Sequence, residues 1–207
     1  GFVVELVESS DFAGKLARLD ELVSSVSVLT PEIYALCRAV ADRQAVTIAD
    51  VFKLAIPTRS VAVEKKWQAA MAEAAVLATP RSKKTKPTGT RTFAFVEPRT
   101  NELGPIWVQQ LTSRAVATLE SGMSTILVVP DFRDQAVILE ALRTKVAETA
   151  LVDYTSQQTN SLRYTAFLRC LTGEPVVVVG SRAALYAPAA NLGEIIIWDD
   201  GDSNLQE

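Results

Sequence analysis

Histidine is absent from the 207 residues, and cysteine occurs only twice, at Cys37 and Cys170. Without histidine, the chain cannot form a Ser–His–Asp triad or a metal site with histidine ligands. Two cysteines are too few for a zinc site or a disulfide framework, and both lie within helical patterns. This scarcity fits a reducing compartment such as the cytoplasm, where both thiols would be buried.

The sequence also lacks any apolar run near the ~18 residues that cross a bilayer, so no membrane partner is expected. Residues 1–5 carry no basic region and no small-residue cleavage site, and we expect no signal peptide. Positive charge is not in excess, since 21 lysines and arginines against 24 aspartates and glutamates give a net charge of −3. Any DNA affinity must therefore come from local basic patches.

The amino-terminal part is predicted to be mostly helical. Thr30 can cap a helix that starts at Pro31, because proline lacks only an N–H that the first turn does not use. Thr47 followed by Asp50 resembles a capping box for the next helix. Further predicted elements are a strand-like run over residues 2–7, a stop of the second helix at Pro57, and an alanine-rich helix over about residues 65–77.

Residues 81–91 combine proline, glycine, serine and threonine with positive charge and contain no apolar side chain. This composition predicts a mobile linker. As an alternative, Lys83 and Lys84 could contact the phosphates of DNA. The predicted division is an amino-terminal part over residues 1–60, a helix and basic linker over residues 61–91, and a third part over residues 92–207.

Beyond the linker, short apolar runs alternate with helical patterns. Unbroken β-branched runs, four valines at 176–179 and three isoleucines at 195–197, are typical of strands buried on both faces of a parallel sheet. This alternation predicts a doubly wound α/β sheet, in which ligands bind beyond the carboxyl ends of the strands. The predicted strands are residues 93–96, 125–129, 150–152, 176–179 and 195–197. The predicted helices are about residues 105–120, 131–144 and 161–171.

The loop after the first predicted strand lacks the glycine-rich sequence, ending in Lys and Ser or Thr, that cradles phosphates. Gly104 is its single glycine, and Pro105 removes a backbone N–H that a phosphate would use. Trp107 and Val108 add bulk where the backbone would have to approach an anion. The sequence therefore predicts that this loop does not form a competent phosphate site.

Polar residues follow two later strands. Asp199 and Asp200 could hold Mg²⁺ through their carboxylates, or could form a solvated acidic turn. Ser181 and Arg182 could hold a phosphate by a hydrogen bond and a charge, or could simply cap a helix and lie on the surface. These residue pairs are the candidate site residues of the sheet.

Residues 173–188, GEPVVVVGSRAALYAP, resemble a block of the PriA family of primosomal replication-restart proteins. Residues 191–197, NLGEIII, resemble the block that follows it, and the residues up to Pro57 resemble the end of the family's 3′-DNA-binding domain and the helices after it. The resemblance implies a RecA-like first helicase lobe preceded by a smaller, mostly helical segment. It also implies DNA and other primosome proteins as partners, and zinc ligands and a second lobe only beyond this chain.

The chain departs from this family at the nucleotide motifs. The family's phosphate-loop Lys and Thr fall on Trp107 and Val108. Its metal-binding Asp falls on Trp198, and its catalytic Glu falls on Asp199. Phosphoryl transfer depends on these charges. The departures therefore predict that ATP and Mg²⁺, even if they bind, do not support unwinding.

Two functions follow from the resemblance. The first is a replication-restart protein that binds stalled or branched forks and helps primosome assembly without helicase activity. Its DNA contacts would be Ser181, Arg182, Arg133 and the basic linker. The second is an active DNA-dependent ATPase and 3′–5′ helicase, with Asp199 and Asp200 on Mg²⁺.

A third function belongs to a different class. Trp107 and Trp198 follow strands by position, so the two indoles could face one another and line an apolar pocket of a small-molecule-binding α/β domain. The alternative is that both indoles pack together in the space that ATP would occupy.

Overall fold

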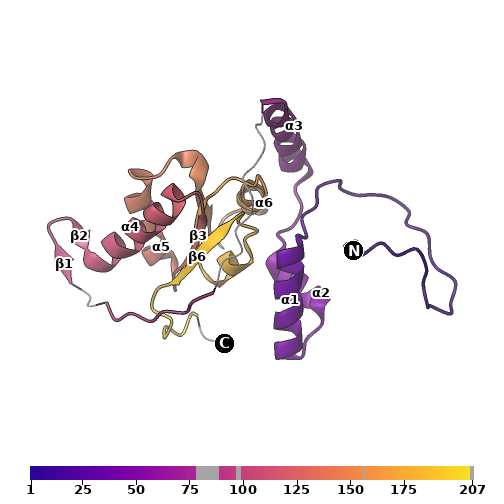
Figure 1. Cartoon of the computed structure of the whole chain (residues 1–207), viewed down its shortest axis with the longest axis horizontal. Coiled ribbons are helices and arrows are strands. Elements are labelled where there is room, and N and C mark those ends of the chain that lie inside the picture. The colour runs from indigo at the N-terminus through magenta and orange to yellow at the C-terminus, as the bar shows by residue number, and fades with distance from the viewer. Residues whose placement is uncertain (78–88, 97–98, 156, 206–207) are drawn as a thin grey trace.

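The computed structural model describes residues 1–77, 89–96, 99–155 and 157–205 (Figure 1). Lys83 and Lys84 of the predicted linker lie outside the described residues. Across the described part of the chain, no helix combines the length and the apolar character needed to cross a membrane.

Three helices form the amino-terminal part: α1 (Pro31–Gln44), α2 (Ile48–Ala55) and α3 (Val61–Leu77). Both predicted caps are confirmed. The Thr30 hydroxyl accepts a hydrogen bond from the N–H of Ile33 at 3.3 Å, and the Thr47 hydroxyl accepts one from the N–H of Asp50 at 3.3 Å. Each cap satisfies a first-turn donor that has no partner within the helix.

The strand-like run predicted over residues 2–7 forms no strand, so that prediction is wrong. Phe2, Val4 and Leu6 are 43%, 51% and 87% exposed. The Phe2 ring packs edge-on against Phe52 of α2, with 5.4 Å between the ring centroids, and in Figure 1 the chain then runs on in an extended form away from the helices. Alternating apolar residues form a strand only when a neighbouring strand pairs with their backbone, and no described segment does so here.

A parallel four-stranded sheet with the order β4–β5–β3–β6 forms the centre of the second part. Its strands are β3 (Ser124–Val128), β4 (Leu151–Tyr154), β5 (Val177–Gly180) and β6 (Leu192–Ile197). Helix α4 (Ile106–Glu120) precedes β3, α5 (Phe132–Arg143) follows β3, and α6 (Asn160–Cys170) connects β4 to β5. The shorter elements are β1 (Thr100–Asn101), β2 (Gly104–Pro105), η1 (Glu148–Ala150) and η2 (Arg182–Tyr186). The predicted α/β class with a parallel sheet is confirmed.

Two apolar clusters cover the two faces of this sheet. On one face, α4 and α5 pack against Leu127, Val177 and Val179. On the other face, α6 packs against Ile126 and Val178. Successive residues of a strand point to opposite faces, so the valine run is buried along its whole length, as predicted.

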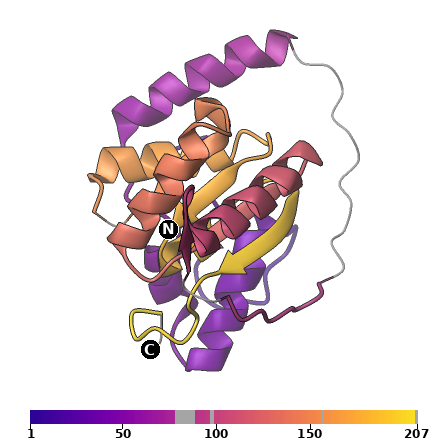
Figure 2. The ribbon, with the colours of Figure 1, turned by 90° about the vertical axis from the view of Figure 1, so that its left-hand side faces the viewer.

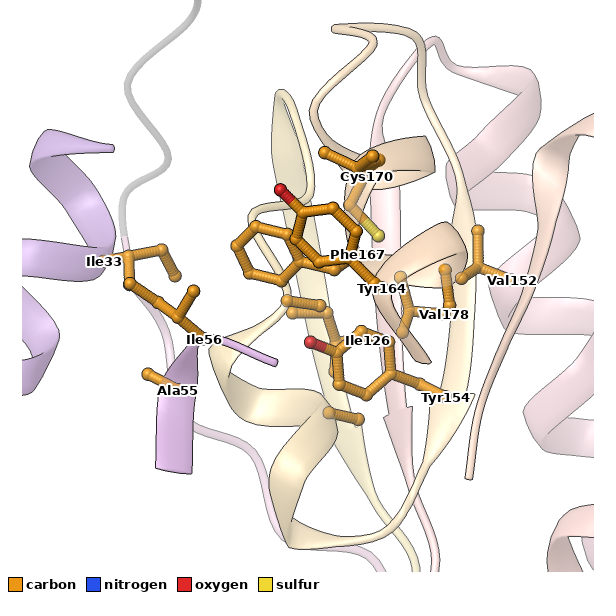
Figure 3. Packing of buried hydrophobic residues seen from close by; sticks show 14 of the residues in the cluster. Ile33, Ala55, Ile56, Ile126, Val152, Tyr154, Tyr164, Phe167, Cys170 and Val178 are labelled. Atoms are coloured by element: carbon orange, nitrogen blue, oxygen red, sulfur yellow. The ribbon is translucent and has the colours of Figure 1, made fainter. Parts of the chain in front are cut away.

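The amino-terminal helices share the second of these clusters with the sheet. Figure 3 shows Ile33, Ala55 and Ile56 on one side of the cluster, with Tyr154 and Tyr164 on the other. Helix α3 also contacts α6, which it crosses in Figure 2. A continuous core therefore contains residues from both sides of the predicted boundary at residue 60.

One further strand prediction is wrong, and the strand predicted over residues 195–197 forms as part of β6 but without the predicted burial. Residues 93–96 form no strand, and Phe93 and Phe95 are 70% and 107% exposed. Ile195 and Ile197 are each 47% exposed, although an unbroken isoleucine run predicts burial on both faces. The reason is that β6 is an edge strand, and the side chains that cover this face of β3 do not extend over it.

Candidate functional site

The carboxyl ends of the parallel strands lie along one edge of the sheet. Val128 of β3 pairs with Gly180 of β5 and with Ile197 of β6. Tyr154 of β4 also pairs with Gly180. The residues that follow these four strands are therefore neighbours, which is where parallel sheets bind ligands.

Gly180 ends β5 at a position that no larger residue fits. A Cβ atom there would lie 2.6 Å from the carbonyl oxygen of Tyr154 and 3.0 Å from the Cβ of Ala184. The chain turns at once into η2, with Ser181 at its N-cap. The absent side chain thus allows Ser181 and Arg182 to leave the sheet close against β4.

Two arginines are exposed at this edge. Arg182 starts η2, and Arg133 lies in the first turn of α5, which follows the neighbouring strand β3. The Ser181 side chain makes no capping bond to η2. The Arg133 guanidinium lies over the Phe132 ring, 5.7 Å from its centroid, in a cation–π arrangement. Guanidinium and hydroxyl groups of this kind can bind phosphate oxygens.

Trp107 and Trp198 stack on one another near the same edge. Their ring centroids are 4.5 Å apart, and the ring planes differ by 6°. Trp107 is in the first turn of α4, and the backbone N–H of Trp198 donates to the carbonyl of Val128 at 2.9 Å. Both indoles also contact the cluster between the sheet and α4 and α5, in which Val108 is buried. The stack therefore fills the space between the start of α4 and the end of β6.

The residues before α4 form a tight hairpin in place of an open phosphate loop. Strands β1 and β2 pair antiparallel, and Gly104 has a φ of 101°. The N-cap of α4 is Pro105, which has no N–H, and the N–H of Ile106 donates to the carbonyl of Arg99 at 2.9 Å. The Gln109 amide also donates to the Gly104 carbonyl at 2.9 Å. Two positions whose N–H groups would face a phosphate therefore offer it no donor.

Four carboxylates gather around the start of α5 and the turn after β6. The pKa of Asp134 is raised, first by burial and then by the charges of Asp131, Asp199 and Asp202. Asp131 is the N-cap of α5 and accepts the N–H groups of Arg133 and Asp134 at 2.8 and 3.0 Å. This concentration of negative charge opposes the binding of a triphosphate close by.

Asp199 and Asp200 lie in the turn after β6. Asp199 has a φ of 48°, and its carbonyl accepts the N–H of Asp202 at 3.0 Å. Within the described ranges, no three side chains of His, Cys, Asp or Glu are placed to hold a metal ion. The hypothesis that Asp199 and Asp200 bind Mg²⁺ therefore has no third protein ligand in that part of the chain.

Sequence reasoning missed a buried polar contact beneath this edge. Gln135 of α5 is 4% exposed, and its amide donates to Asp153 Oδ1 at 2.7 Å and to the carbonyl of Val179 at 3.1 Å. Asp153 Oδ1 also accepts the N–H of Thr155 at 3.2 Å. These bonds connect α5 to β4 and β5 and fix the start of the loop after β4. The sequence does contain an indication of this contact, because Gln135 lies on the same face of its helix as the apolar residues Ile138, Leu139 and Leu142, which are buried.

An open groove of about 950 Å³ runs beside this contact, along α5 and the loop after β4. Phe132, Leu103 and Gln158 are among the residues that line it, and neither tryptophan is. Trp107 and Trp198 contact each other directly, so the described residues form no apolar pocket between the two indoles.

The fold and the site together define a class: an α/β chain with cationic residues at the carboxyl edge of its sheet and an indole stack near that edge. The amino-terminal part adds to this description. Residues 1–57 match the family model described as the 3′DNA-binding domain (3′BD). The helices that share a core with the sheet therefore belong mainly to a segment that matches a DNA-binding domain.

Over its whole length, the chain is similar to proteins named "Probable replication restart protein PriA". It is 34% identical over 215 residues to the protein of Mycobacterium tuberculosis strain H37Rv, and 32% identical over 222 residues to that of Mycobacterium leprae. A third match, 27% identical over 89 residues, covers 43% of this chain and 11% of the "Replication restart protein PriA" of Synechocystis sp.. The chain is PriA-like, as its sequence blocks predict, and it spans about one third of the length of the mycobacterial relatives, 34% and 33%.

Proposed function

We propose that this chain is a DNA-binding part of a replication-restart protein, which binds forked or single-stranded DNA and helps to assemble a primosome without hydrolysing ATP. One observation carries this proposal: the stacked indoles of Trp107 and Trp198 occupy positions where the family has a Lys and a metal-binding Asp. The match of residues 1–57 to a 3′DNA-binding domain supports the DNA-binding role. Under this proposal, residues 92–207 are a RecA-like lobe that serves as a scaffold.

Three properties of the chain argue against nucleotide hydrolysis. The two indoles take up the space between α4 and β6, Pro105 and Ile106 offer no free donor, and carboxylates surround the start of α5. A phosphoryl-transfer site needs the opposite: backbone donors, an ammonium group and a bound cation around the transferred phosphate.

Calorimetric titration with ATP and Mg²⁺, together with phosphate release in the presence of forked DNA, tests this part. We expect neither saturable heat nor DNA-stimulated release. Saturable binding with phosphate release that Asp199→Ala abolishes would support the alternative of an active ATPase.

The proposed DNA contacts of the sheet are Ser181, Arg182 and Arg133, with Lys83 and Lys84 of the linker. The first three follow the neighbouring strands β5 and β3 and lie on the surface at one edge. A cation that neutralises one phosphate releases bound counterions, so each contact steepens the salt dependence of affinity.

Fluorescence anisotropy with a labelled fork measures these contacts. We expect Arg182→Ala and Arg133→Ala each to weaken binding about fivefold and to lower the salt slope by about 1. Arg143→Ala is the matched control, because Arg143 ends the same helix α5 and pairs with Glu140 at 2.8 Å. Wild-type affinity in both test variants would refute these contacts without refuting DNA binding by residues 1–57. A paired Lys83→Ala and Lys84→Ala variant tests the linker separately.

A further inference from the structure

The Glu64 carboxylate on α3 accepts hydrogen bonds from three other segments of the chain. Arg59, in the connection before α3, donates through Nε at 3.1 and 3.0 Å to the two oxygens and through Nη2 at 2.7 Å. The Ser24 hydroxyl donates at 2.9 Å, and the Tyr164 hydroxyl of α6 donates at 2.5 Å. The side chain of Glu64 is only 3% exposed and that of Arg59 is 32% exposed, so the carboxylate is enclosed by protein while its arginine partner reaches the surface.

A buried carboxylate is retained at this position because every partner is supplied. The hydrogen bond from Arg59 is the largest cause of a Glu64 pKa lowered to about 2, and those from Tyr164 and Ser24 act in the same direction against burial. Burial, together with the bond to Glu64, raises the pKa of Tyr164. A buried ion pair often adds no more stability than an apolar contact of equal volume, but removing one partner leaves a buried charge uncompensated, which favours the arrangement that keeps every partner in place. The network therefore specifies how its segments are arranged.

The segments that meet at Glu64 belong to different parts of the molecule. Ser24 lies within residues 1–57, which match the 3′DNA-binding domain. Tyr164 is 1% exposed in α6, the helix between β4 and β5. Arg182 begins η2, which follows β5 along the chain. Glu64 thus connects the DNA-binding segment to α6, the helix that precedes β5 and the proposed phosphate contacts after it.

The other polar contacts between these parts are more exposed. The hydroxyls of Ser60 and Ser161 lie 3.4 Å apart at the surface, and the Gln68 amide donates to the Ser25 hydroxyl at 3.0 Å. Water competes for exposed bonds of this kind, and they constrain geometry weakly. Among these described polar contacts, the bond from Tyr164 to Glu64 is the buried one.

We propose that Glu64 is a positioning residue, which holds the 3′DNA-binding segment and the carboxyl edge of the sheet in one fixed arrangement so that both contact the same DNA molecule. The inference rests on the proposed function, because it requires both surfaces to bind DNA. Once one surface has bound, the effective concentration at which the other meets its phosphates depends on how well the frame between them matches the span on the DNA. Loss of the frame then removes the cooperation between the two surfaces without removing either surface.

The test uses the whole 207-residue chain and two variants. Glu64→Gln keeps the shape of the side chain and removes its charge. Tyr164→Phe removes only the hydroxyl that donates to Glu64. It replaces Glu64→Gln in the measurements if that variant does not fold. The matched controls are Glu73→Gln, an exposed glutamate on the same helix α3, and Tyr34→Phe, which removes a hydroxyl beside the same apolar cluster.

The first measurement is a double-mutant cycle on fork affinity. We expect Arg182→Ala to weaken binding about fivefold in the parent and control backgrounds and less than twofold with Glu64→Gln or Tyr164→Phe. Equal weakening in all backgrounds, with folding confirmed by circular dichroism, would mean that Glu64 acts on stability alone and would overturn the proposal.

The second measurement does not depend on DNA and so separates this proposal from the proposed function. Spin labels on Arg43→Cys of α1 and Glu120→Cys of α4, both exposed, report the distance between the two parts. We expect a narrow distribution in the parent and a broad one with Glu64→Gln. An unchanged distance distribution in Glu64→Gln would overturn the positioning role. A broadened distribution, combined with no effect of Arg182→Ala on fork affinity in any background, would refute only the assigned DNA contact.

Discussion

The indole stack makes a quantitative prediction about stability. Replacing either Trp107 or Trp198 by alanine removes a large, partly buried side chain from the apolar cluster between the sheet and helices α4 and α5. Full burial of an aromatic residue gives about 3–5 kcal/mol for such a change, so partial burial suggests roughly 2–3 kcal/mol for each variant. The stacked contact itself, at 4.5 Å and 6°, should contribute about 1 kcal/mol of this loss.

Urea denaturation followed by circular dichroism measures these values without depending on tryptophan emission. With a slope of about 2 kcal/mol per molar urea, each single variant should unfold at a midpoint roughly 1 M lower. The double variant should lose less than the sum of the two singles by about 1 kcal/mol, since the shared contact is lost once. Trp107→Ala with Trp67→Ala is the control cycle, because Trp67 contacts the other cluster and the two losses should add.

Strict additivity of Trp107→Ala and Trp198→Ala would show that the indoles do not touch in solution. A rise of the unfolding midpoint with ATP and Mg²⁺ would also refute the reasoning, because a ligand that binds the folded state must stabilise it. Either result would reopen the space between α4 and β6 to a nucleotide.

Three further outcomes are expected. Glu64→Gln should remove part of the pH dependence of the free energy of unfolding in acid. The Glu64 pKa is lowered from 4.5 to about 2, so its carboxylate stabilises the fold by on the order of 3 kcal/mol above pH 4.5, and this contribution disappears as the pH falls through 2. Measuring the free energy of unfolding against pH in both proteins tests this. Gly180→Ala should destabilise the chain by about 1–3 kcal/mol, because its Cβ would press on backbone, whereas Gly201→Ala, with no atom within 4 Å of the added Cβ, should change little in the same urea assay. Trp107→Lys combined with Val108→Thr should not restore ATP binding by calorimetry, since the Lys ammonium would face an indole and no Mg²⁺ ligand would be regained.

The helix caps and the valine strand could be predicted from sequence because their causes are local. Thr30, Pro31 and Thr47 act on backbone groups within three residues. The valine run at 176–179 needs only to be apolar on both faces to enter both clusters. Such features depend on chain chemistry that a sequence states directly.

The fate of residues 93–96 and the exposure of β6 could not be predicted, because both depend on neighbours. An apolar segment predicts a strand, but only tertiary pairing decides whether its backbone finds a partner. Phe93 and Phe95 remain exposed, and Ile195 and Ile197 lie at the edge of the sheet. The same limit applies to Glu64, whose partners Ser24 and Tyr164 lie far apart in the sequence.

The candidate site was partly predictable, because chain order in a parallel sheet fixes which loops meet. That rule brings Ser181 and Arg182 next to the end of β3. For Trp107 its premise fails, because residues 93–96 form no strand, although the indoles of Trp107 and Trp198 do stack. The rule gave no indication of the β1–β2 hairpin, which redirects the Ile106 N–H to a carbonyl, or of the buried amide of Gln135. Those contacts depend on backbone geometry and on side-chain direction.

Trp107 and Trp198, at the positions where the resemblance implies a Lys and a metal-binding Asp, form one structural unit. With Trp107 in place, a carboxylate at position 198 would lie against an indole and next to Asp199, whose charge already raises the pKa of Asp134. With Trp198 in place, an ammonium at position 107 would be held beside an apolar ring over a buried cluster. Each tryptophan therefore removes the physical reason for the charged group at the other position. In the stack both rings bury apolar surface, and neither carries a charge that needs a partner.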